Sequence, residues 1–251
     1  MGARDVPLSD PVGTMIPGVL TLACSALDAR PLFWTERDGT RYGYEPAAAE
    51  LVATELSLAT RWSFLQWSDF GAAIERGDAD GIWCGSAITP ERQARWDYSS
   101  PYAVFDESVI VRADEAADTP GKLAGRRVGA IAGSTNMALA ESFQDAVTVP
   151  FGGETDDVLG DMISALRAGE VDAIVDDDVA LVPLAAATED LKIAFTVPTR
   201  NRWGMAMRKD NEELRSSIDA ALGAITADGR LRDAWERWLP DLAYPFSGAR
   251  P

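Results

Sequence analysis

Short apolar runs alternate with amphipathic stretches along most of the chain. Residues 19–24 form an apolar run of the length of a buried strand, and residues 44–59 then place apolar side chains at helical spacing around Pro46. The pattern predicts further strands at 60–67, 80–86, 108–111, 127–131, 147–150, 171–175, 191–197 and 203–208. It predicts further helices at 70–76, 136–143, 156–168, 211–227 and 231–239. Strands that alternate with helices favour doubly wound sheets in which most strands are parallel.

The alternation comes as two sets of strands and helices, at residues 18–103 and 107–198, with no linker rich in proline, glycine or serine between them. In open α/β sheets, ligands bind beyond the carboxyl ends of the strands. Functional side chains are therefore expected where the predicted strands end. These positions are Ser25 to Asp28, Trp67, Gly85 to Arg92, Gly133 to Asn136 and Asp176 to Asp178.

Two of these strand-to-helix turns suit an anion. In the first, Thr89 is placed to cap a helix and Arg92 lies in its first turn, where a guanidinium can grip a carboxylate with two hydrogen bonds. In the second, Ser134 and Thr135 present hydroxyls and backbone amides at a helix start. A surface arginine and an ordinary helix cap are the alternative interpretations, and they stay open.

Acidic and aromatic residues stand at other strand ends. Asp176, Asp177 and Asp178 follow a predicted strand and could hold an ammonium group or a metal, or could form a solvated loop. Trp67 could form the wall of a ligand site, whereas Trp83 is better explained by core packing. Together with Arg92, the acidic residues would hold a zwitterion between two lobes.

Composition removes several classes of function. The formal charge of −17 disfavours nucleic acid and anionic membranes as partners. The chain has no histidine, which excludes Ser–His–Asp and Cys–His catalysis and most zinc sites. Cys24 and Cys84 fall in predicted strands, so we expect buried thiols, and a disulfide stays open if those strands are neighbours. No apolar stretch is long enough to span a membrane, residues 1–17 show no signal peptide, and no cofactor is expected.

Several motifs resemble those of one family. Residues 88–92 and 96–102 resemble its T-x-E-R and F-S-x-P-Y signature, and residues 123–129 resemble its L-x-G-K-x-V-G step. Residues 169–173 resemble its G-x-x-D-A motif, and the ending 228–239 is also typical. On these residues, the chain resembles the amino-acid-type periplasmic solute-binding proteins, family 3, which serve ABC importers.

The resemblance implies an α/β fold of two lobes that close like a Venus flytrap, each a doubly wound, mainly parallel sheet flanked by helices. Lobe one would comprise residues 1–104 and 203–251, and lobe two residues 105–202. Two hinge strands would lie near residues 102–106 and 199–203.

The resemblance also implies roles for single residues. Arg92 matches the arginine that pairs with a ligand carboxylate, and Ser134 and Thr135 match the helix start that holds the same group. Asp177 matches the aspartate that holds the α-ammonium, Gly85 matches a backbone acceptor for it, and Trp67 matches the wall against the ligand side chain. The list of matching positions is Arg92, Ser134, Thr135, Asp177, Gly85 and Trp67.

Two departures leave the ligand open. Ala87 stands where the family often has Ser or Thr, so one carboxylate contact is lost. The first strand leads to Leu27-Asp28 rather than to an aromatic, which changes the pocket wall. Asp28 and Asp176, with Trp67, suggest a ligand with a cationic or polar side chain.

The resulting expectation is a monomeric, non-enzymatic binding protein outside the cytoplasm, in the periplasm or on the cell surface, that delivers an amino-acid-like ligand to a membrane permease. One alternative is an enzyme on the same fold that resembles cyclohexadienyl (arogenate/prephenate) dehydratases, with Glu154, Asp156 or Asp176 as the acid. The other is the ligand-sensing module of a receptor. Because nothing is appended beyond Trp238 except a short tail, a transport component is favoured.

Overall fold

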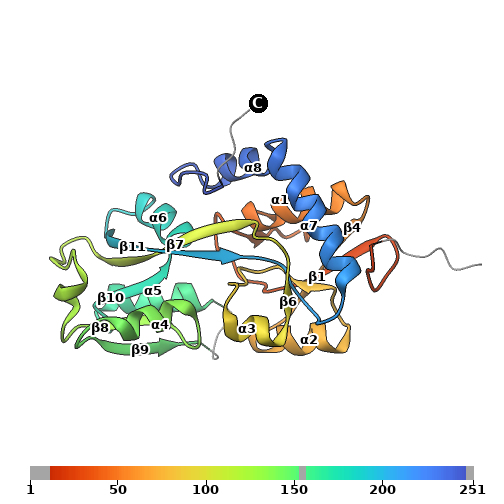
Figure 1. Ribbon diagram of the computed structural model, residues 1–251. Helices are drawn as coiled ribbons and strands as arrows, with labels where there is room; N and C mark the ends of the chain where they lie inside the picture. The colour runs from red at the N-terminus through yellow and green to blue at the C-terminus, as the bar shows by residue number, and fades with distance from the viewer. Residues whose placement is uncertain (1–11, 153–156, 247–251) are drawn as a thin grey trace, which may run out of the picture.

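Two α/β halves lie side by side and are joined by long strands that run between them, as Figure 1 shows for this computed structural model. The structure describes residues 12–152 and 157–246. We call the half built on the sheet β4-β1-β5-β12-β6 lobe one, and the half built on the sheet β11-β7-β10-β8-β9 lobe two. The two-lobed α/β fold that the sequence predicts is therefore confirmed.

Lobe one is a five-stranded sheet with helices packed against it. Its strands are β1 (Val19–Cys24), β4 (Ala59–Phe64), β5 (Gly81–Ile82), β6 (Asp97–Tyr98) and β12 (Ala206–Met207). Its helices are α1 (Tyr44–Glu55), α2 (Phe70–Arg76), α3 (Pro90–Arg95), α7 (Glu212–Ala227) and α8 (Arg230–Trp238). Strand β1 is parallel to β4 and β5, while β12 runs antiparallel to β5 and β6. Helices α1, α7 and α8 pack together, and α2 packs against β1 and β5.

Lobe two has a mainly parallel sheet in which one strand, β7, runs against the others. Its strands are β7 (Ala103–Arg112), β8 (Arg127–Ile131), β9 (Val147–Phe151), β10 (Ala173–Asp177) and β11 (Leu191–Trp203). Its helices are α4 (Thr135–Ser142), α5 (Val158–Ala168) and α6 (Asp178–Ala186). Both sheets are mixed because one strand of each runs against the others. In lobe two this strand is β7, which is antiparallel to β10 and β11, and in lobe one it is β12, which is antiparallel to β5 and β6.

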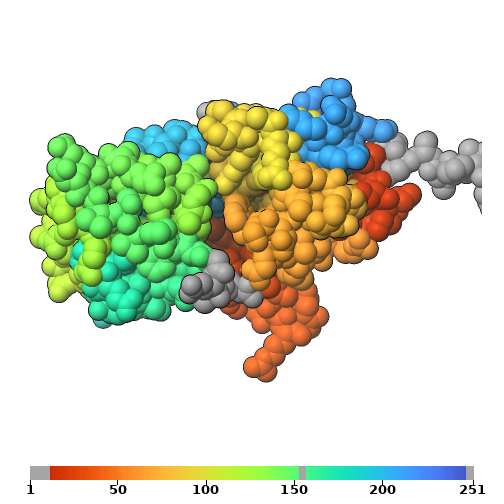
Figure 2. Space-filling model, turned by 90° about the horizontal axis from the view of Figure 1, so that it is seen from below, coloured from red at the N-terminus to blue at the C-terminus, as the bar shows by residue number. Residues whose placement is uncertain are grey.

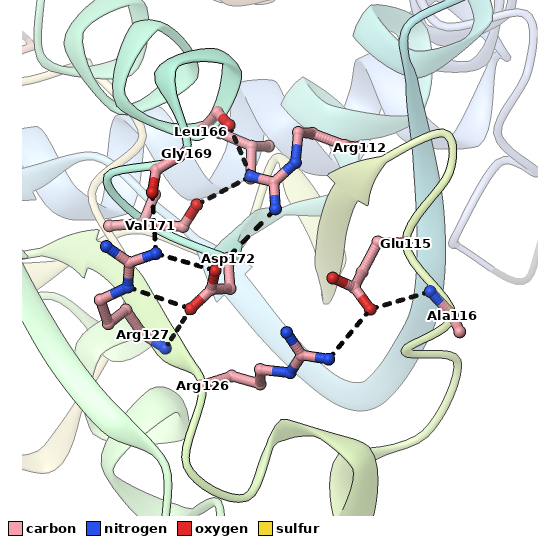
Figure 3. A network of polar contacts seen from close by, with 9 residues as sticks. All are labelled: Arg112, Glu115, Ala116, Arg126, Arg127, Leu166, Gly169, Val171 and Asp172. Carbon is pink, nitrogen blue, oxygen red and sulfur yellow. Dashed lines mark hydrogen bonds and ion pairs between the residues drawn. The ribbon is translucent and has the colours of Figure 1, made fainter.

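A polar network holds the start of β10 (Figure 3). Asp172, the acid of the G-x-x-D-A motif, accepts hydrogen bonds from the backbone N–H of Arg127 at 2.9 Å and from its guanidinium at 3.0 and 3.1 Å. Arg112 approaches the same carboxylate at 3.9 Å, and the Arg126–Glu115 pair lies beside it. Hydrogen bonding from Arg127 lowers the pKa of Asp172. The motif thus fixes the start of β10, and the acidic residues at the carboxyl end of the strand lie about 16 Å further on.

The pairing of the two strands that run between the lobes is irregular at the place where they pass from one lobe to the other. Pairing between β7 and β11 shifts register between Val197 and Asn201. Within this irregular stretch, Arg200 has a φ of 53°, and its N–H donates to Asp106 Oδ1 at 2.9 Å. These contacts locate a break in the ladder close to the hinge segments that the sequence suggests.

The structure confirms some of the predicted limits of helices and strands and changes others. Helix α2 ends at Gly77, which has a φ of 78°. The predicted strand at 80–86 is shorter, and the two predicted strands between 191 and 208 are one long strand, β11, followed by the short β12. The hairpin of β2 (Trp34–Thr35) and β3 (Arg41–Tyr42) has no counterpart in the predicted pattern, because it lacks a run of apolar residues.

The cysteines and tryptophans also have defined places. Cys24 and Cys84 are buried and carry free thiols, on β1 and just after its neighbour β5. Trp83 is fully buried and stacks on Tyr102 with ring centroids 4.2 Å apart, which confirms its assignment to the core. Across the described ranges, the structure contains no helix with the length and apolar character needed to cross a bilayer.

Candidate functional site

Arg92 is held at the start of α3 by contacts of its backbone and of its guanidinium. Helix α3 begins as the sequence predicts: Thr89 Oγ1 accepts a hydrogen bond from Arg92 N–H at 3.2 Å, and Pro90 is the first helical residue. Arg92 Nη1 donates to the carbonyl oxygen of Ala87 at 3.2 Å. Its guanidinium carbon lies 5.5 Å from the ring centroid of Trp67. This bracing orients the half-buried cation.

Trp67 presents a large aromatic surface beside this arginine. It lies in the short 3₁₀ helix η1 (Trp67–Asp69), after the end of β4, rather than inside a strand. It is 49% exposed, although it meets the buried Phe70 edge to face at 5.3 Å. An aromatic ring of this size that stays half-exposed beside a cation is suited to contact a ligand side chain.

The turn between β5 and α3 is fixed by contacts with Glu45 and Trp203. Gly85 has a φ of 57°, and its N–H donates to Glu45 Oε1 at 3.3 Å. A Cβ at this glycine would lie 3.4 Å from the Trp203 ring. Ala87 is buried and forms a β-bridge with Trp203, the last residue of β11. The turn is therefore packed against the end of a strand that crosses between the lobes.

The start of α4 offers backbone amides. Ser134 caps this helix: its Oγ accepts from Met137 N–H at 3.1 Å and donates to the carbonyl oxygen of Ile131 at 2.6 Å. Both functions of the hydroxyl are thus used locally, so an anion here would be bound by free N–H groups of the first turn, which begins at Thr135.

The carboxyl end of β10 carries the acidic residues. Asp176 and Asp177 are the last residues of this strand rather than a loop after it. Asp177 Oδ1 accepts from Asn136 Nδ2 at 2.8 Å, and Asp176 Oδ1 accepts from Asp177 N–H at 2.7 Å. Burial raises the pKa of both carboxyls. Burial also raises the pKa of Asp178 to about 6, although Asp178 accepts a hydrogen bond from the N–H of Asp106.

Glu107 adds a further buried carboxyl to this group. It is 2% exposed and lies opposite Asp177 in the pairing of β7 with β10. Burial raises its pKa, and the polar side chains of Thr135, Thr199 and Asn201 oppose this rise. Glu107 Oε1 nevertheless has no hydrogen-bond partner within the described parts of the chain.

Three of these carboxyls, Asp176, Asp177 and Glu107, have no basic partner in the part of the chain that the structure describes. Among the described residues, Asp176, Asp177 and Glu107 form no ion pair with lysine or arginine, and no group of three or more acidic or thiol side chains is arranged to hold a metal ion. Buried carboxylates without a counter-ion are costly, so this edge favours an incoming organic cation.

The acidic residues lie at the boundary between the lobes. Val179 and Ala180, in the first turn of α6, pack in the same hydrophobic cluster as Trp203 and Tyr102. The same cluster contains core residues of lobe one, such as Leu22 and Trp83, so the carboxyl end of β10 lies near the boundary with lobe one. Seen from below, Figure 2 shows a furrow between the green lobe and the orange and yellow one.

Not every residue expected at the site is brought into these two groups. Asp28 lies on an exposed loop and is bound by Arg30, with an Nε–Oδ1 distance of 3.0 Å. Glu154 and Asp156, named as candidate acids of an enzyme, lie outside the described residues.

Sequence reasoning missed Glu45 and Glu107, and it placed Asn136 at a predicted strand end without giving it a role. Asn136 stands directly after Thr135, so its proximity to the helix start was available. Glu45 lies in the first turn of a helix, where an acidic residue is common because of the helix dipole, and nothing in the pattern marked it as buried. Glu107 stands directly before the predicted strand at 108–111, and only its missing partner in three dimensions distinguishes it.

Comparison with known families identifies the family of the chain. A model of the bacterial extracellular solute-binding proteins, family 3, matches residues 22–241. The chain belongs to this family. The resemblance carried by the sequence motifs is thereby confirmed.

Individual relatives of this family cover most of the chain. The L-cystine-binding protein TcyJ of Escherichia coli K12 is 26% identical over 212 residues, which are 83% of this chain and 78% of TcyJ. The substrate-binding protein AbpA of Streptococcus pneumoniae, solved with L-arginine, has a TM-score of 0.76 and 26% identity, and covers 88% of this chain and 94% of its own. An ancestral amino acid-binding protein, a precursor of cyclohexadienyl dehydratase, has a TM-score of 0.77 and 23% identity, and covers 88% and 95%.

Proposed function

We propose that this protein is the extracytoplasmic substrate-binding component of an ABC importer, and that it binds an amino acid or a similar zwitterion between its lobes. The observation that carries this proposal is the opposite charge of the two edges. Lobe one offers Arg92 beside the exposed Trp67. Lobe two offers Asp177, a buried carboxyl that forms no ion pair with a lysine or arginine among the described residues. A zwitterion supplies both missing charges at once.

The proposed contacts follow from the free groups on each edge. Arg92 and the free N–H groups of the first turn of α4, from Thr135 onward, bind the ligand carboxylate, while Ser134 caps this turn and holds it in place. Asp177, which Asn136 orients, accepts from the α-ammonium. The ligand can also meet the carbonyl oxygen of Gly85. Ala87, the remaining residue of that turn expected at the site, has no hydroxyl and contributes its backbone alone.

The ligand side chain is proposed to lie against Trp67. Of the two acids that suggested a cationic or polar side chain, Asp176 is buried beside Asp177 and Asp28 is bound by Arg30. Asp28 would therefore exchange its arginine partner in order to contact a ligand, whereas Asp176 adds negative charge at the ammonium end without such an exchange. The acidic contribution of Asp176 thus needs less rearrangement.

Binding is proposed to close the two lobes about hinges near residues 102–106 and 199–203. Lobe one then comprises residues 1–104 and 203–251, and lobe two residues 105–202. The interruption of the β7–β11 ladder beside Arg200 supports this division, because a broken ladder bends more easily than a continuous one. A ligand that contacts both edges shifts the balance of open and closed forms toward the closed one.

We infer that binding is not followed by chemistry. The dehydratase precursor among the structural relatives is itself described as an amino acid-binding protein, and its likeness at 23% identity concerns the fold. Asp176 is the one candidate acid of an enzyme within the described residues. A spectrophotometric assay with prephenate and arogenate tests the alternative, and we expect no dehydration.

The partner is proposed to be the membrane permease of the importer, and the protein to act as a monomer outside the cytoplasm. The family description, which names extracellular solute-binding proteins, supports this location. The large negative charge also suits a freely diffusing component rather than one bound to an anionic membrane surface.

A thermal-shift screen tests the proposal directly. The panel contains the proteinogenic amino acids with L-cystine, ornithine, citrulline, betaines, ectoine and prephenate. A ligand present at about 100 times its dissociation constant stabilises the folded state by about 2.7 kcal/mol, which is a clear shift. We expect one class of amino acid to give it. No shift with any member of the panel, for protein first unfolded and refolded to remove bound ligand, would contradict the proposal.

A further inference from the structure

A buried carboxylate outside the two edges takes hydrogen bonds from residues far apart in the chain. Glu45, the second residue of α1, is 1% exposed. Its Oε1 accepts from the N–H of Gly85 at 3.3 Å, and the hydroxyl of Tyr102 lies 2.9 Å from Oε1 and 3.1 Å from Oε2. The backbone oxygen of Glu45 also accepts from Trp83 Nε1 at 3.0 Å.

These partners belong to the two parts of lobe one that matter for binding. Gly85 lies in the turn that faces the proposed site, whereas Tyr102 immediately precedes β7, the first strand to cross between the lobes. Tyr102 is fixed further: its N–H donates to the carbonyl oxygen of Trp203 at 3.0 Å, and its carbonyl oxygen accepts from the hydroxyl of Tyr44. Its ring stacks on Trp83 with an interplanar angle of 9°.

We propose that Glu45 is a positioning residue for ligand binding, whose carboxylate ties the Gly85 turn to Tyr102 at the start of the hinge strand β7. The inference rests on the proposed function, because it assumes that the Gly85 turn contacts the ligand and that β7 bends on closure. Glu45 itself does not contact the ligand. It acts by holding the turn and the hinge in one arrangement, so that movement of either is transmitted to the other.

The ionised form of Glu45 is the form that makes these contacts. A carboxylate accepts from both Gly85 and Tyr102. A protonated carboxyl keeps one acceptor oxygen for the N–H of Gly85 but turns the other oxygen into a donor, so the Tyr102 hydroxyl must accept instead of donate and its own hydrogen loses the charged acceptor. An isosteric amide has the same defect. Replacement of Glu45 by glutamine therefore weakens the link to Tyr102 while it keeps the volume of the side chain.

The surroundings of Glu45 place its titration in an accessible range. Burial raises its pKa to about 7, and the hydrogen bonds from Tyr102 and Gly85 and the charge of Arg41 oppose the rise. The other titratable groups that face it are Tyr44, Cys24 and Cys84. Their own pKa values are raised by burial, so these three groups stay uncharged while Glu45 titrates.

The first experiment measures ligand affinity against pH. The probe is whichever of L-arginine, L-glutamine and L-cystine gives the largest thermal shift, and the variants are Glu45→Gln, Tyr102→Phe and, as control, Glu50→Gln on the exposed side of the same helix. At about pH 8 we expect Glu45→Gln to weaken binding about tenfold and Tyr102→Phe about threefold, with no change in the control. The Glu45→Gln ratio should shrink toward about pH 6, because wild-type Glu45 then becomes protonated.

The second experiment needs no ligand. Amide hydrogen exchange of the free protein is followed in segments 83–88 and 102–106. We expect Glu45→Gln to accelerate exchange in both segments, Tyr102→Phe to accelerate it mainly in the second, and Glu50→Gln to leave both unchanged. Tyr102→Phe retains the ring that stacks on Trp83, so it tests the link even if Glu45→Gln fails to fold.

The outcomes separate this inference from the proposed function. If the wild type binds the probe and Glu45→Gln binds it equally well, or with a ratio that does not change with pH, the positioning role is wrong. If no amino acid binds the wild type, the proposed function is wrong, and the exchange experiment still decides whether Glu45 ties the two segments together. Unchanged exchange in both segments would overturn the inference.

Discussion

At the proposed site, the two lobes differ in sign of charge and also in how far their polar groups are already satisfied. Arg92 in lobe one is braced by the Ala87 carbonyl and the Trp67 ring, and Gly85 is bound by Glu45. In lobe two, Asp177 is crowded by other buried carboxyls, and burial raises its pKa. The comparison shows that the polar groups of lobe one are already oriented for a ligand. In lobe two, the ionised form of the buried carboxyls is unfavourable, and a ligand ammonium would stabilise it.

The largest expected effect on ligand affinity comes from removing the cation of lobe one. Arg92→Ala should weaken binding of the amino acid found by the screen at least about 100-fold, because a ligand carboxylate is then left in the site without its charge partner. Isothermal titration calorimetry measures this loss. The matched control is Arg95→Ala on the same helix, where the guanidinium is bound to Glu75 at 2.7 Å. Similar affinities for both variants would contradict the assignment.

Removal of the charge on the opposite edge should weaken binding and stabilise the fold at the same time. Asp177→Asn should reduce affinity about tenfold to 100-fold, since the amide still accepts from Asn136 but no longer attracts an ammonium. Because burial raises the pKa of Asp177 in the folded state, its ionisation destabilises that state, and the amide avoids this cost at neutral pH.

The gain in stability can be measured without any ligand. Each kcal/mol gained raises the Tm of a chain of this size by about 2–4 °C. Differential scanning calorimetry should show a higher Tm for Asp177→Asn than for the wild type near neutral pH, and a smaller difference under acid conditions. A lower Tm for the variant at neutral pH would mean that Asp177 is a structural residue with a satisfied charge.

The aromatic surface of lobe one should contribute less. Trp67→Ala should weaken binding about threefold to tenfold, since it removes contact area and the cation–π contact with Arg92. Its Tm should change little because the ring is 49% exposed. Tyr42→Ala, at an exposed aromatic residue of the β2–β3 hairpin, is the control. An equal effect of the two variants on affinity would remove Trp67 from the site.

The smallest effect is a pH dependence of the free protein. Burial raises the pKa of Asp178 and Asp176, so the folded state binds protons more tightly than the unfolded state does. Stability contributed in this way is present at low pH and is lost as the pH rises from about 4 to about 7. We expect a Tm a few degrees lower at about pH 8 than at about pH 5.5. Asp177→Asn should flatten this profile, and a profile that rises toward pH 8 would contradict the unpaired state of the acidic group.

The sequence by itself determined the features that depend on residues close together in the chain. The order of strands and helices placed Arg92, Ser134 and Asp177 at strand ends, where ligands bind in this class of fold. The caps made by Thr89 and Ser134 involve hydrogen bonds across three residues, so short patterns are sufficient to predict them.

Only the tertiary structure decided which polar groups are satisfied. Glu45 meets Gly85 and Tyr102 across 40 and 57 residues of sequence, and no local pattern carries such a pairing. Glu107 becomes a buried carboxyl without a partner at Oε1 because β7 is placed against β10. Asp28, by contrast, has a partner, because it forms an ion pair with Arg30. The sequence gives the type of each side chain, but its burial and its partners arise only when distant segments pack together. Burial and partners then determine the charge of the side chain and its role.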